Sequence, residues 1–274
     1  MKGLNMAKTI TAANQKGGVG KSTSTINLGR AAAVQGLRVL IVDFDPQGNT
    51  TSALAKEPLE RDEDNEIVQV TVADVIEPRS KMPLAEVIIP TIWDNIDLAP
   101  AGTPLAVVEE MIIPATAREY KLKTALQPVL SQYDLILIDS PPSLGQLTVN
   151  ALTASDQVLV VAQPQQWSAD GMAELSKTVG QVQKHFNPQL TYAGVLINMW
   201  QGTTEERATK RNKQVLTDIQ SYFTEAPVLR PFIPFRTHIG EAIDEGVGLD
   251  QWRSVPMRAI AEDYSTHVNK LMGT

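Results

Sequence analysis

The stretch Lys16-Gly17-Gly18-Val19-Gly20-Lys21-Ser22-Thr23 decides the fold. It follows the apolar run Ile10–Ala13 and leads into a segment with helix-like composition. A strand, a glycine-rich turn and a helix in this order can cradle a phosphate, because the N–H groups of the turn surround the anion and the helix N-terminus adds its positive dipole end. In such a loop Lys21 reaches the β- and γ-phosphates of a nucleotide, and the Ser22 hydroxyl ligates Mg²⁺. The stretch therefore predicts a phosphate-binding turn in an α/β fold.

The composition is that of an ordinary soluble globular protein. Of the 274 residues, 43% are hydrophobic and 20% are charged. No window approaches the ~20 apolar residues of a membrane span, and Met1–Lys8 lacks the apolar core of a signal peptide, so we expect a cytoplasmic protein. The absence of cysteine excludes disulfides and thiolate metal sites. The net charge of −7 argues mildly against a surface coated in nucleic acid, but it leaves room for a local basic patch.

Short apolar runs alternate with helix-like segments along the chain. The expected strands are near-continuous apolar runs, as in strands buried on both faces of a parallel sheet: Thr9–Ala13, Arg38–Asp43, Ile96–Ala99, Leu135–Asp139, Gln157–Ala162, Tyr192–Ile197 and Val228–Phe232. The expected helices are Ser22–Gln35, Ala117–Ser131, Gln146–Ala154, Ala169–Lys184 and Glu205–Tyr222. This alternation predicts a doubly wound, mostly parallel central sheet with helices on both faces. No linker divides residues 1–274, so we expect one domain, with Glu57–Glu66 as a solvated surface loop.

Acidic residues follow two of the expected strands. Asp43 and Asp45 lie in the segment Asp43-Phe44-Asp45-Pro46-Gln47-Gly48-Asn49, and Asp139 ends the apolar run Leu135–Asp139. Ligands bind at the carboxyl edge of such sheets, so these carboxylates are expected beside the glycine-rich turn. Four apolar residues that end in an acid form a Walker B pattern, which supplies a metal-binding carboxylate. Asp, Pro, Gly and Asn also favour a turn, so residues 43–49 are predicted to be both a turn and part of a site.

Together these motifs resemble those of the ParA/Soj-type partition ATPases, a group that also includes MinD and nitrogenase iron protein. The resemblance is carried by K-G-G-x-G-K-[ST], the deviant Walker A motif, by D-x-D-P-Q-G-N at residues 43–49, and by D-x-P-P-S at residues 139–143. The chain departs from the ordinary P-loop at Gln15, where that pattern has glycine, and carries the second lysine Lys16. Because an iron–sulfur cluster needs cysteine ligands, the nitrogenase iron protein is excluded.

The resemblance implies roles for individual residues. Lys16 would cross the interface of an ATP-dependent homodimer and contact the partner's nucleotide, Lys21 would bind phosphate, and Asp45 would position the attacking water. Mg²⁺ would be held or supported by Ser22, Asp43 and Asp139. The ATP-binding set would be Lys16, Gly17, Gly18, Val19, Gly20, Lys21, Ser22 and Thr23, with Asn198 and Pro234 on the two sides of the adenine.

ATP is predicted rather than GTP because the N-K-x-D motif of GTPases is absent. The pairs Asn212-Lys213 and Asn269-Lys270 both lack its aspartate. The resemblance also implies that the D-x-P-P-S segment acts as a nucleotide-sensing switch. Its two prolines restrict the backbone after Asp139.

A basic stretch in the C-terminal part of the chain is the candidate DNA interface. Residues 203–238 contain six Lys/Arg against four Asp/Glu. Phosphate binding needs only such a patch, although a solvated helix face has the same composition. Since ParA relatives bind DNA non-specifically with basic residues in this region, the candidates are Arg207, Lys210, Arg211, Lys213, Arg230 and Arg236.

The resemblance thus predicts an ATPase with weak intrinsic activity that dimerises on ATP, binds nucleoid DNA and is released when a ParB-like centromere-binding protein stimulates hydrolysis. No N-terminal helix-turn-helix domain is expected, because the first strand begins within ten residues. One alternative is a ParA-like positioner of non-DNA cargo, and another is a metabolic ATP-dependent ligase on the same scaffold.

The remaining alternative is a MinD-like membrane ATPase, which would use the C-terminal helix. Apolar residues recur there with helical spacing at Met257, Ile260, Ala261, Tyr264, Val268 and Leu271. Membrane-binding helices carry Lys and Arg around such a face, but this one has only Arg258 and Lys270, with Glu262 and Asp263 between them. We therefore expect a helix packed on the sheet and no membrane partner.

Overall fold

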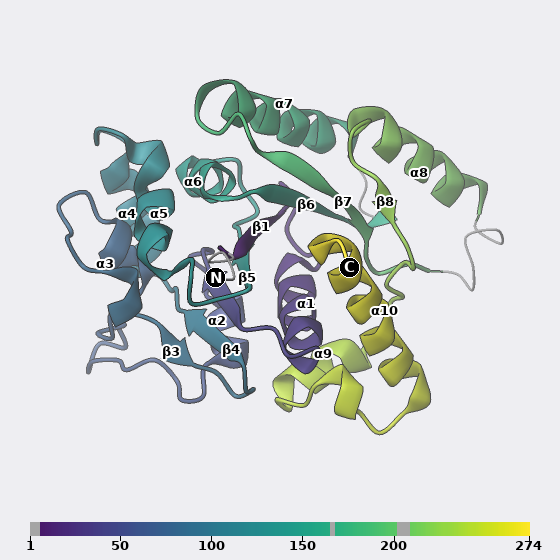
Figure 1. Ribbon diagram of the computed structural model, residues 1–274, viewed down its shortest axis with the longest axis horizontal. Coiled ribbons are helices and arrows are strands. Elements are labelled where there is room, and N and C mark those ends of the chain that lie inside the picture. Colours follow the sequence, from purple (N-terminus) through teal and green to yellow (C-terminus); the bar gives the residue numbers. More distant parts are fainter. Residues whose placement is uncertain (1–5, 165–167, 202–208) are drawn as a thin grey trace, which may run out of the picture.

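The computed structural model describes residues 6–164, 168–201 and 209–274. Within them, the central sheet has eight strands in the order β3-β4-β2-β5-β1-β6-β7-β8 (Figure 1). The strands are β1 Lys8–Ala13, β2 Val39–Asp43, β3 Ile89–Pro90, β4 Ile96–Ala99, β5 Leu135–Asp139, β6 Gln157–Ala162, β7 Thr191–Ile197 and β8 Val228–Leu229. Neighbouring strands pair in parallel except for the antiparallel pair β3–β4. The predicted mostly parallel sheet is confirmed.

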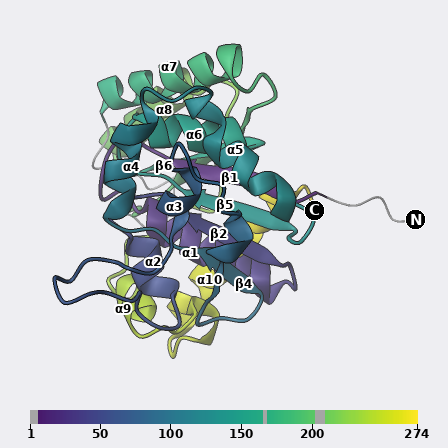
Figure 2. The same ribbon diagram turned by 90° about the vertical axis from the view of Figure 1, so that its left-hand side faces the viewer.

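Helices cover both faces of this sheet, as the two views in Figures 1 and 2 show. Their bounds are α1 Lys21–Val34, α2 Asn49–Leu54, α3 Val72–Ile76, α4 Pro104–Ile112, α5 Lys121–Leu126, α6 Gln146–Ala154, α7 Ala169–His185, α8 Lys210–Tyr222, α9 His238–Asp244 and α10 Val255–Met272. Helices α1, α2, α9 and α10 share one hydrophobic core with the sheet, and α3 to α8 pack against the opposite face.

The strand sequences are apolar at nearly every position because both faces are buried. In β2, for example, Val39 and Ile41 belong to the core under α1, and Leu40 and Val42 belong to the core under α4 and α6. Successive side chains of a strand point to opposite faces. A strand between two helix layers therefore needs apolar residues at both sets of positions.

Two predicted elements are wrong in extent. The expected helix Ala117–Ser131 is a short α5 between two 3-10 turns, Arg118–Tyr120 and Gln127–Val129. Pro128 lies in the second turn and cannot donate the backbone hydrogen bond of an α-helix. The expected strand Val228–Phe232 ends at Leu229, since Pro231 has no N–H group for the ladder.

Helix α4 was not predicted, although its sequence carries recognisable signals. Pro104 occupies its first turn, the position that proline favours. Leu105, Val108 and Ile112 are its buried residues, a spacing of three and four that fits one face of a helix.

The C-terminal helix α10 packs in the core as expected. Its apolar residues Met257, Ile260, Tyr264, Val268 and Leu271 are buried, and α10 lies along α1 in both views (Figures 1 and 2). The face that a membrane-binding helix would present to lipid is therefore covered by protein. No helix in the described ranges is long and apolar enough to cross a membrane.

Candidate nucleotide-binding site

The glycine-rich turn joins β1 to α1 and needs glycine at two positions. Gly18 has φ 74° and Gly20 has φ 87°, in the left-handed region that other residues rarely adopt. Gly20 is also the N-cap of α1, and a Cβ there would overlap the amide nitrogen of Asn198. The first turn of α1 carries no acidic residue, so the positive end of the helix dipole is available to an anion.

The two lysines of the turn face different environments. Lys21 is only 6% exposed, and its Nζ donates to the carbonyl oxygen of Lys16 at 3.3 Å. Burial lowers the pKa of Lys21, and the carboxylates of Asp139 and Asp45 act against that shift. Lys16 is exposed, while its N–H donates to Asn14 Oδ1 at 2.9 Å. A bound phosphate would compensate the buried Lys21 ammonium, whereas Lys16 remains accessible at the rim.

Two buried carboxylates lie side by side next to this turn. Asp43 on β2 is the register partner of Asp139 on β5, and both are at most 1% exposed. Burial, and next the charge of Asp139, raise the pKa of Asp43. Burial also raises the pKa of Asp139, against hydrogen bonds from Ser22 and Thr50 and the charge of Lys21. Like charges this close favour a counter-cation.

The donor set fits Mg²⁺. Asp139 Oδ1 is buried without a hydrogen-bond partner among the described residues, and its Oδ2 accepts from Thr50 Oγ1 at 2.7 Å. Mg²⁺ in nucleotide sites typically takes one or two protein oxygens together with phosphates and waters. The Ser22 hydroxyl and the unpartnered Asp139 oxygen can supply these. Among the described residues, no group of three or more His, Cys, Asp or Glu is placed to hold a metal ion, and a nucleotide-bound Mg²⁺ does not need one.

Asp43 is held by the chain itself. Its Oδ2 accepts from the N–H of Thr51 at 2.8 Å and from Thr51 Oγ1 at 2.7 Å, and its Oδ1 accepts from the N–H of Asp45 at 3.2 Å. This arrangement suits the supporting role predicted for Asp43. Thr50 binds Asp139 and Thr51 binds Asp43. Neither was predicted from the sequence, because threonine is common at the start of any helix.

Asp45 lies on a tight turn before α2. It is 6% exposed, its Oδ1 accepts from the N–H of Gln47 at 3.0 Å, and its carbonyl accepts from Gly48 at 2.9 Å. Gly48 has φ 64°, and a Cβ there would lie 3.0 Å from the carbonyl oxygen of Ala101. The predicted turn is present, and it holds the carboxylate at the sheet edge beside Asp43.

The D-x-P-P-S segment lies against the phosphate turn. The Ser140 hydroxyl donates to the carbonyl of Ala12 at 2.8 Å, and a Cβ at residue 17 would lie 3.8 Å from the Cβ of Pro142. At the start of α6, the N–H of Leu147 donates to Glu109 Oε1 on α4 at 3.1 Å. The segment itself contacts α6, because Thr148 Oγ1 donates to the carbonyl of Ser143 at 2.6 Å, and α6 in turn contacts α4.

The two adenine candidates lie on adjacent segments beyond β7. Asn198 is 3% exposed; its Nδ2 donates to the carbonyl of Val19 at 3.0 Å, and its Oδ1 accepts from Met199 N–H at 2.8 Å. Pro234 is half-buried and pairs with Trp200 in an isolated bridge. Asn198 therefore stabilises the phosphate turn through its hydrogen bond to Val19. Contact of Asn198 or Pro234 with adenine stays a prediction.

The basic candidates come from two segments. Lys210, Arg211 and Lys213 are exposed at the start of α8, and Arg230 and Arg236 are exposed after β8. Arg230 lies over the Phe232 ring, 5.5 Å from its centroid, and Arg236 donates to the carbonyl of Phe235 at 2.7 Å. Arg207 lies outside the described residues.

A glycine-rich turn between β1 and α1, with acidic strand ends beside it on a mostly parallel sheet, defines a P-loop nucleoside triphosphatase fold. A family model described as an AAA domain matches residues 7–192. The sporulation initiation inhibitor protein Soj of Bacillus subtilis is 41% identical over 241 residues, which cover 88% of this chain and 89% of that protein. The chromosome partitioning protein ParA of Caulobacter vibrioides is 35% identical, over 87% of this chain and 84% of that one. The chain belongs to the ParA/Soj family of partitioning ATPases.

A solved structure agrees with the fold and with the predicted cofactors. Cobyrinic acid a,c-diamide synthase from Mycobacterium smegmatis, with bound ADP and magnesium, is 32% identical with a TM-score of 0.75, and the match covers 96% of this chain and 95% of that one. The expectation of ATP and Mg²⁺ is consistent with the ligands of this neighbour.

Proposed function

We propose that this chain is a DNA-partition ATPase that dimerises on ATP, binds DNA non-specifically and leaves it when a partner stimulates hydrolysis. The observation that carries the proposal is the difference in burial between the two lysines of the glycine-rich turn. Lys21 is buried near the carboxylates of Asp139 and Asp45, and Lys16 is exposed. A site that works within one subunit needs only the inner lysine. An outer lysine on the same loop is suited to the nucleotide of a second subunit.

In this proposal the chemistry needs few groups, because phosphoryl transfer depends mainly on positioning and charge neutralisation. The turn N–H groups and Lys21 hold the phosphates. Ser22 and Asp139 would hold Mg²⁺, which would supply positive charge to the phosphate oxygens. Asp45, fixed by the Gln47 N–H, orients the attacking water. Intrinsic turnover is slow, and a ParB-like protein raises it.

DNA binding in this proposal is electrostatic. The exposed basic residues of α8 and of the segment after β8 are suited to backbone phosphates, which require no sequence reading. If each subunit neutralises about three phosphates, a dimer neutralises about six. Dimerisation on ATP then acts as the switch, and the protein is associated with the nucleoid.

Binding to a fluorescent duplex of random sequence tests the proposal, with ATP and with ADP and at increasing salt. We expect binding with ATP alone, and an affinity loss of about 10³-fold between roughly 50 and 200 mM salt. Arg236→Ala should weaken binding, whereas Arg79→Ala, an exposed arginine after α3, should not. Equal DNA affinity with ATP and with ADP would refute the proposed switch. An equal loss of DNA affinity in Arg236→Ala and Arg79→Ala would refute the proposed interface.

The second candidate function is that of a metabolic ATP-dependent enzyme. It is supported by the 32% identity to cobyrinic acid a,c-diamide synthase, whose structure holds ADP and magnesium. It predicts that cobyrinic acid stimulates ATP turnover and that DNA and a ParB-like protein do not. The higher identity to Soj over most of both chains favours the partition function.

A further inference from the structure

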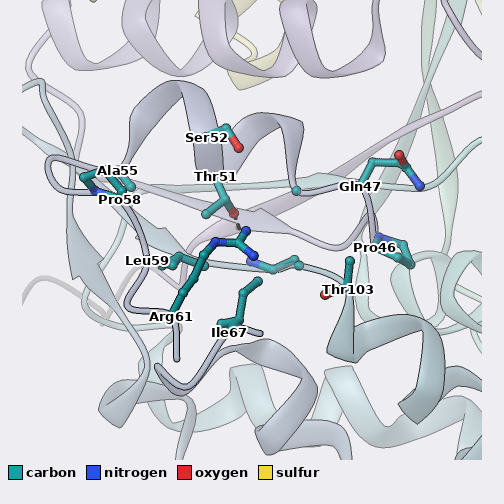
Figure 3. A pocket seen from close by; sticks show the side chains of 13 residues that line it. Pro46, Gln47, Thr51, Ser52, Ala55, Pro58, Leu59, Arg61, Ile67 and Thr103 are labelled. Carbon is teal, nitrogen blue, oxygen red and sulfur yellow. Dashed lines mark hydrogen bonds between the residues drawn. The ribbon is translucent and has the colours of Figure 1, made fainter. Parts of the chain in front are cut away.

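A pocket of about 240 Å³ lies beside the turn that carries Asp45 (Figure 3). One wall is that turn, residues 46–48, together with Thr51 and Ser52 of α2 and Ala55 at its C-terminal end. The other wall is a hairpin, residues 57–68, which we call the acidic hairpin. In it Arg61 bridges to Ile67, the N–H of Asp62 donates to Glu66, and the N–H of Val68 donates to Glu60. The segment predicted as a solvated surface loop is exposed at nearly every residue, and it also forms one wall of this cavity.

The one charged side chain that lines the pocket is basic, although the hairpin is acidic. Arg61 is the one charged residue among the thirteen that line it. Its guanidinium points into the cavity (Figure 3), while Glu60, Asp62, Glu63, Asp64 and Glu66 are exposed and line none of it. Arg61 Nη1 donates to the carbonyl of Asn65 at 2.7 Å. Because a guanidinium has five N–H donors, most of its capacity remains for an anion.

Apolar residues make up half of the other twelve that line the pocket. Pro46, Leu59 and Ile67 face the cavity (Figure 3), and Ile67 packs so closely on Gly102 that a Cβ at residue 102 would overlap it. The polar side is completed by Gln47, Thr51, Ser52 and Thr103. An arginine opposite an apolar wall selects a ligand with one anionic end and one apolar end.

The size of the pocket limits the ligand. Cavities that hold drug-sized ligands measure roughly 300–1,000 Å³, and an engineered cavity of about 150 Å³ binds benzene. A space of about 240 Å³ therefore suits a ring-sized body with a single charged group.

We propose that this pocket binds a small organic anion, a carboxylate or a phosphate monoester on a compact apolar body. The Arg61 guanidinium pairs with the anion, and Leu59 and Ile67 pack against the body. The pocket also shares residues with the nucleotide site, because Gln47 holds Asp45 and Thr51 holds Asp43. A bound ligand thus contacts the groups that fix both carboxylates, and its binding depends neither on DNA nor on a partner.

Methyl NMR of the full chain without nucleotide tests the site, with Leu59, Thr51 and Ile67 as reporters. The probes are benzoate, phenyl phosphate, their neutral analogue benzyl alcohol, and inorganic phosphate. A ligand this small should bind with a Kd on the order of 1 mM. We expect saturable chemical-shift changes with benzoate, with phenyl phosphate or with both, and the comparison shows whether the pocket prefers a carboxylate or a phosphate. Benzyl alcohol and inorganic phosphate should bind at least tenfold more weakly.

Arg61→Gln should weaken benzoate and phenyl phosphate binding at least tenfold, and the control Arg79→Gln should leave it unchanged. Both side chains are exposed, so both variants should keep the melting temperature of the parent. Equally strong binding of benzyl alcohol, unchanged binding in Arg61→Gln, or no saturable shift with either aromatic anion would overturn the proposal. Since no nucleotide, DNA or partner is present, such a failure would leave the proposed partition function standing.

Discussion

The phosphate site and the basic C-terminal segments are built in opposite ways. Asp43, Asp45 and Asp139 are buried, and each accepts at least one hydrogen bond from a backbone or threonine group. Lys210, Arg211 and Arg236 are exposed on the surface. The difference matches the two proposed roles, because hydrolysis would require atoms held in fixed places, whereas contact with DNA phosphates would require only positive charge within reach. Substitutions should therefore be severe in the first region and graded in the second.

The largest effect is expected from Lys21→Ala. The variant removes the one buried ammonium of the turn, and ATP turnover should fall by about 10³-fold with a matching loss of nucleotide affinity. A fluorescent ATP analogue and a phosphate-release assay measure both, and Lys177→Ala, exposed on α7, is the control. Turnover within twofold of the parent would place the phosphate site elsewhere.

A smaller loss, confined to turnover, is expected from Asp45→Asn. The change keeps the size of the side chain and removes its charge, so hydrolysis should fall by about 10²-fold while ATP affinity stays nearly the same. Single-turnover hydrolysis and nucleotide binding separate the two effects. The exposed Asp94→Asn serves as the control. Equal losses of affinity and turnover would argue against a role in positioning water.

Asn198→Ala tests the point where the C-terminal half touches the phosphate turn. The change removes the donor to the buried Val19 carbonyl, so the free energy of unfolding should fall by about 2 kcal/mol. Urea denaturation measures the loss, and Asn269→Ala, exposed on α10, should cost less than about 0.5 kcal/mol. Equal stability of the two variants would mean that the turn does not depend on Asn198.

The smallest effect concerns His267 in α10 and appears only as a pH dependence. His267 is fully buried, and burial lowers its pKa to about 4. The unfolded chain, with a histidine pKa of about 6.5, takes up the proton first as pH falls. Stability from the neutral ring is therefore present above about pH 6.5 and decreases as pH falls towards 4, by about 1 kcal/mol between roughly pH 6 and pH 5.

Urea denaturation across this pH range measures the slope. His267→Leu should reduce the slope by that amount, and the exposed His238→Gln should not. An unchanged slope in His267→Leu would mean that the ring is not buried in solution.

Where the sequence was predictive, one physical requirement dominated the residue choice. Burial on both faces made β2 and β5 apolar at nearly every position, and the phosphate turn needed glycine and lysine at fixed places. Where the sequence was not predictive, the role of a residue depended on contacts with residues far away in the chain. Thr50 and Thr51 matter because they face Asp139 and Asp43, and Arg61 turns into a pocket although its neighbours in sequence are acidic.

The central claim is that ATP bound at the phosphate turn controls contact with DNA through a dimer. The most direct measurement is the DNA affinity of Lys16→Ala in saturating ATP, with nucleotide occupancy determined in the same sample. We predict normal ATP occupancy and DNA binding reduced to the level seen with ADP. Normal occupancy with undiminished DNA binding would contradict the claim.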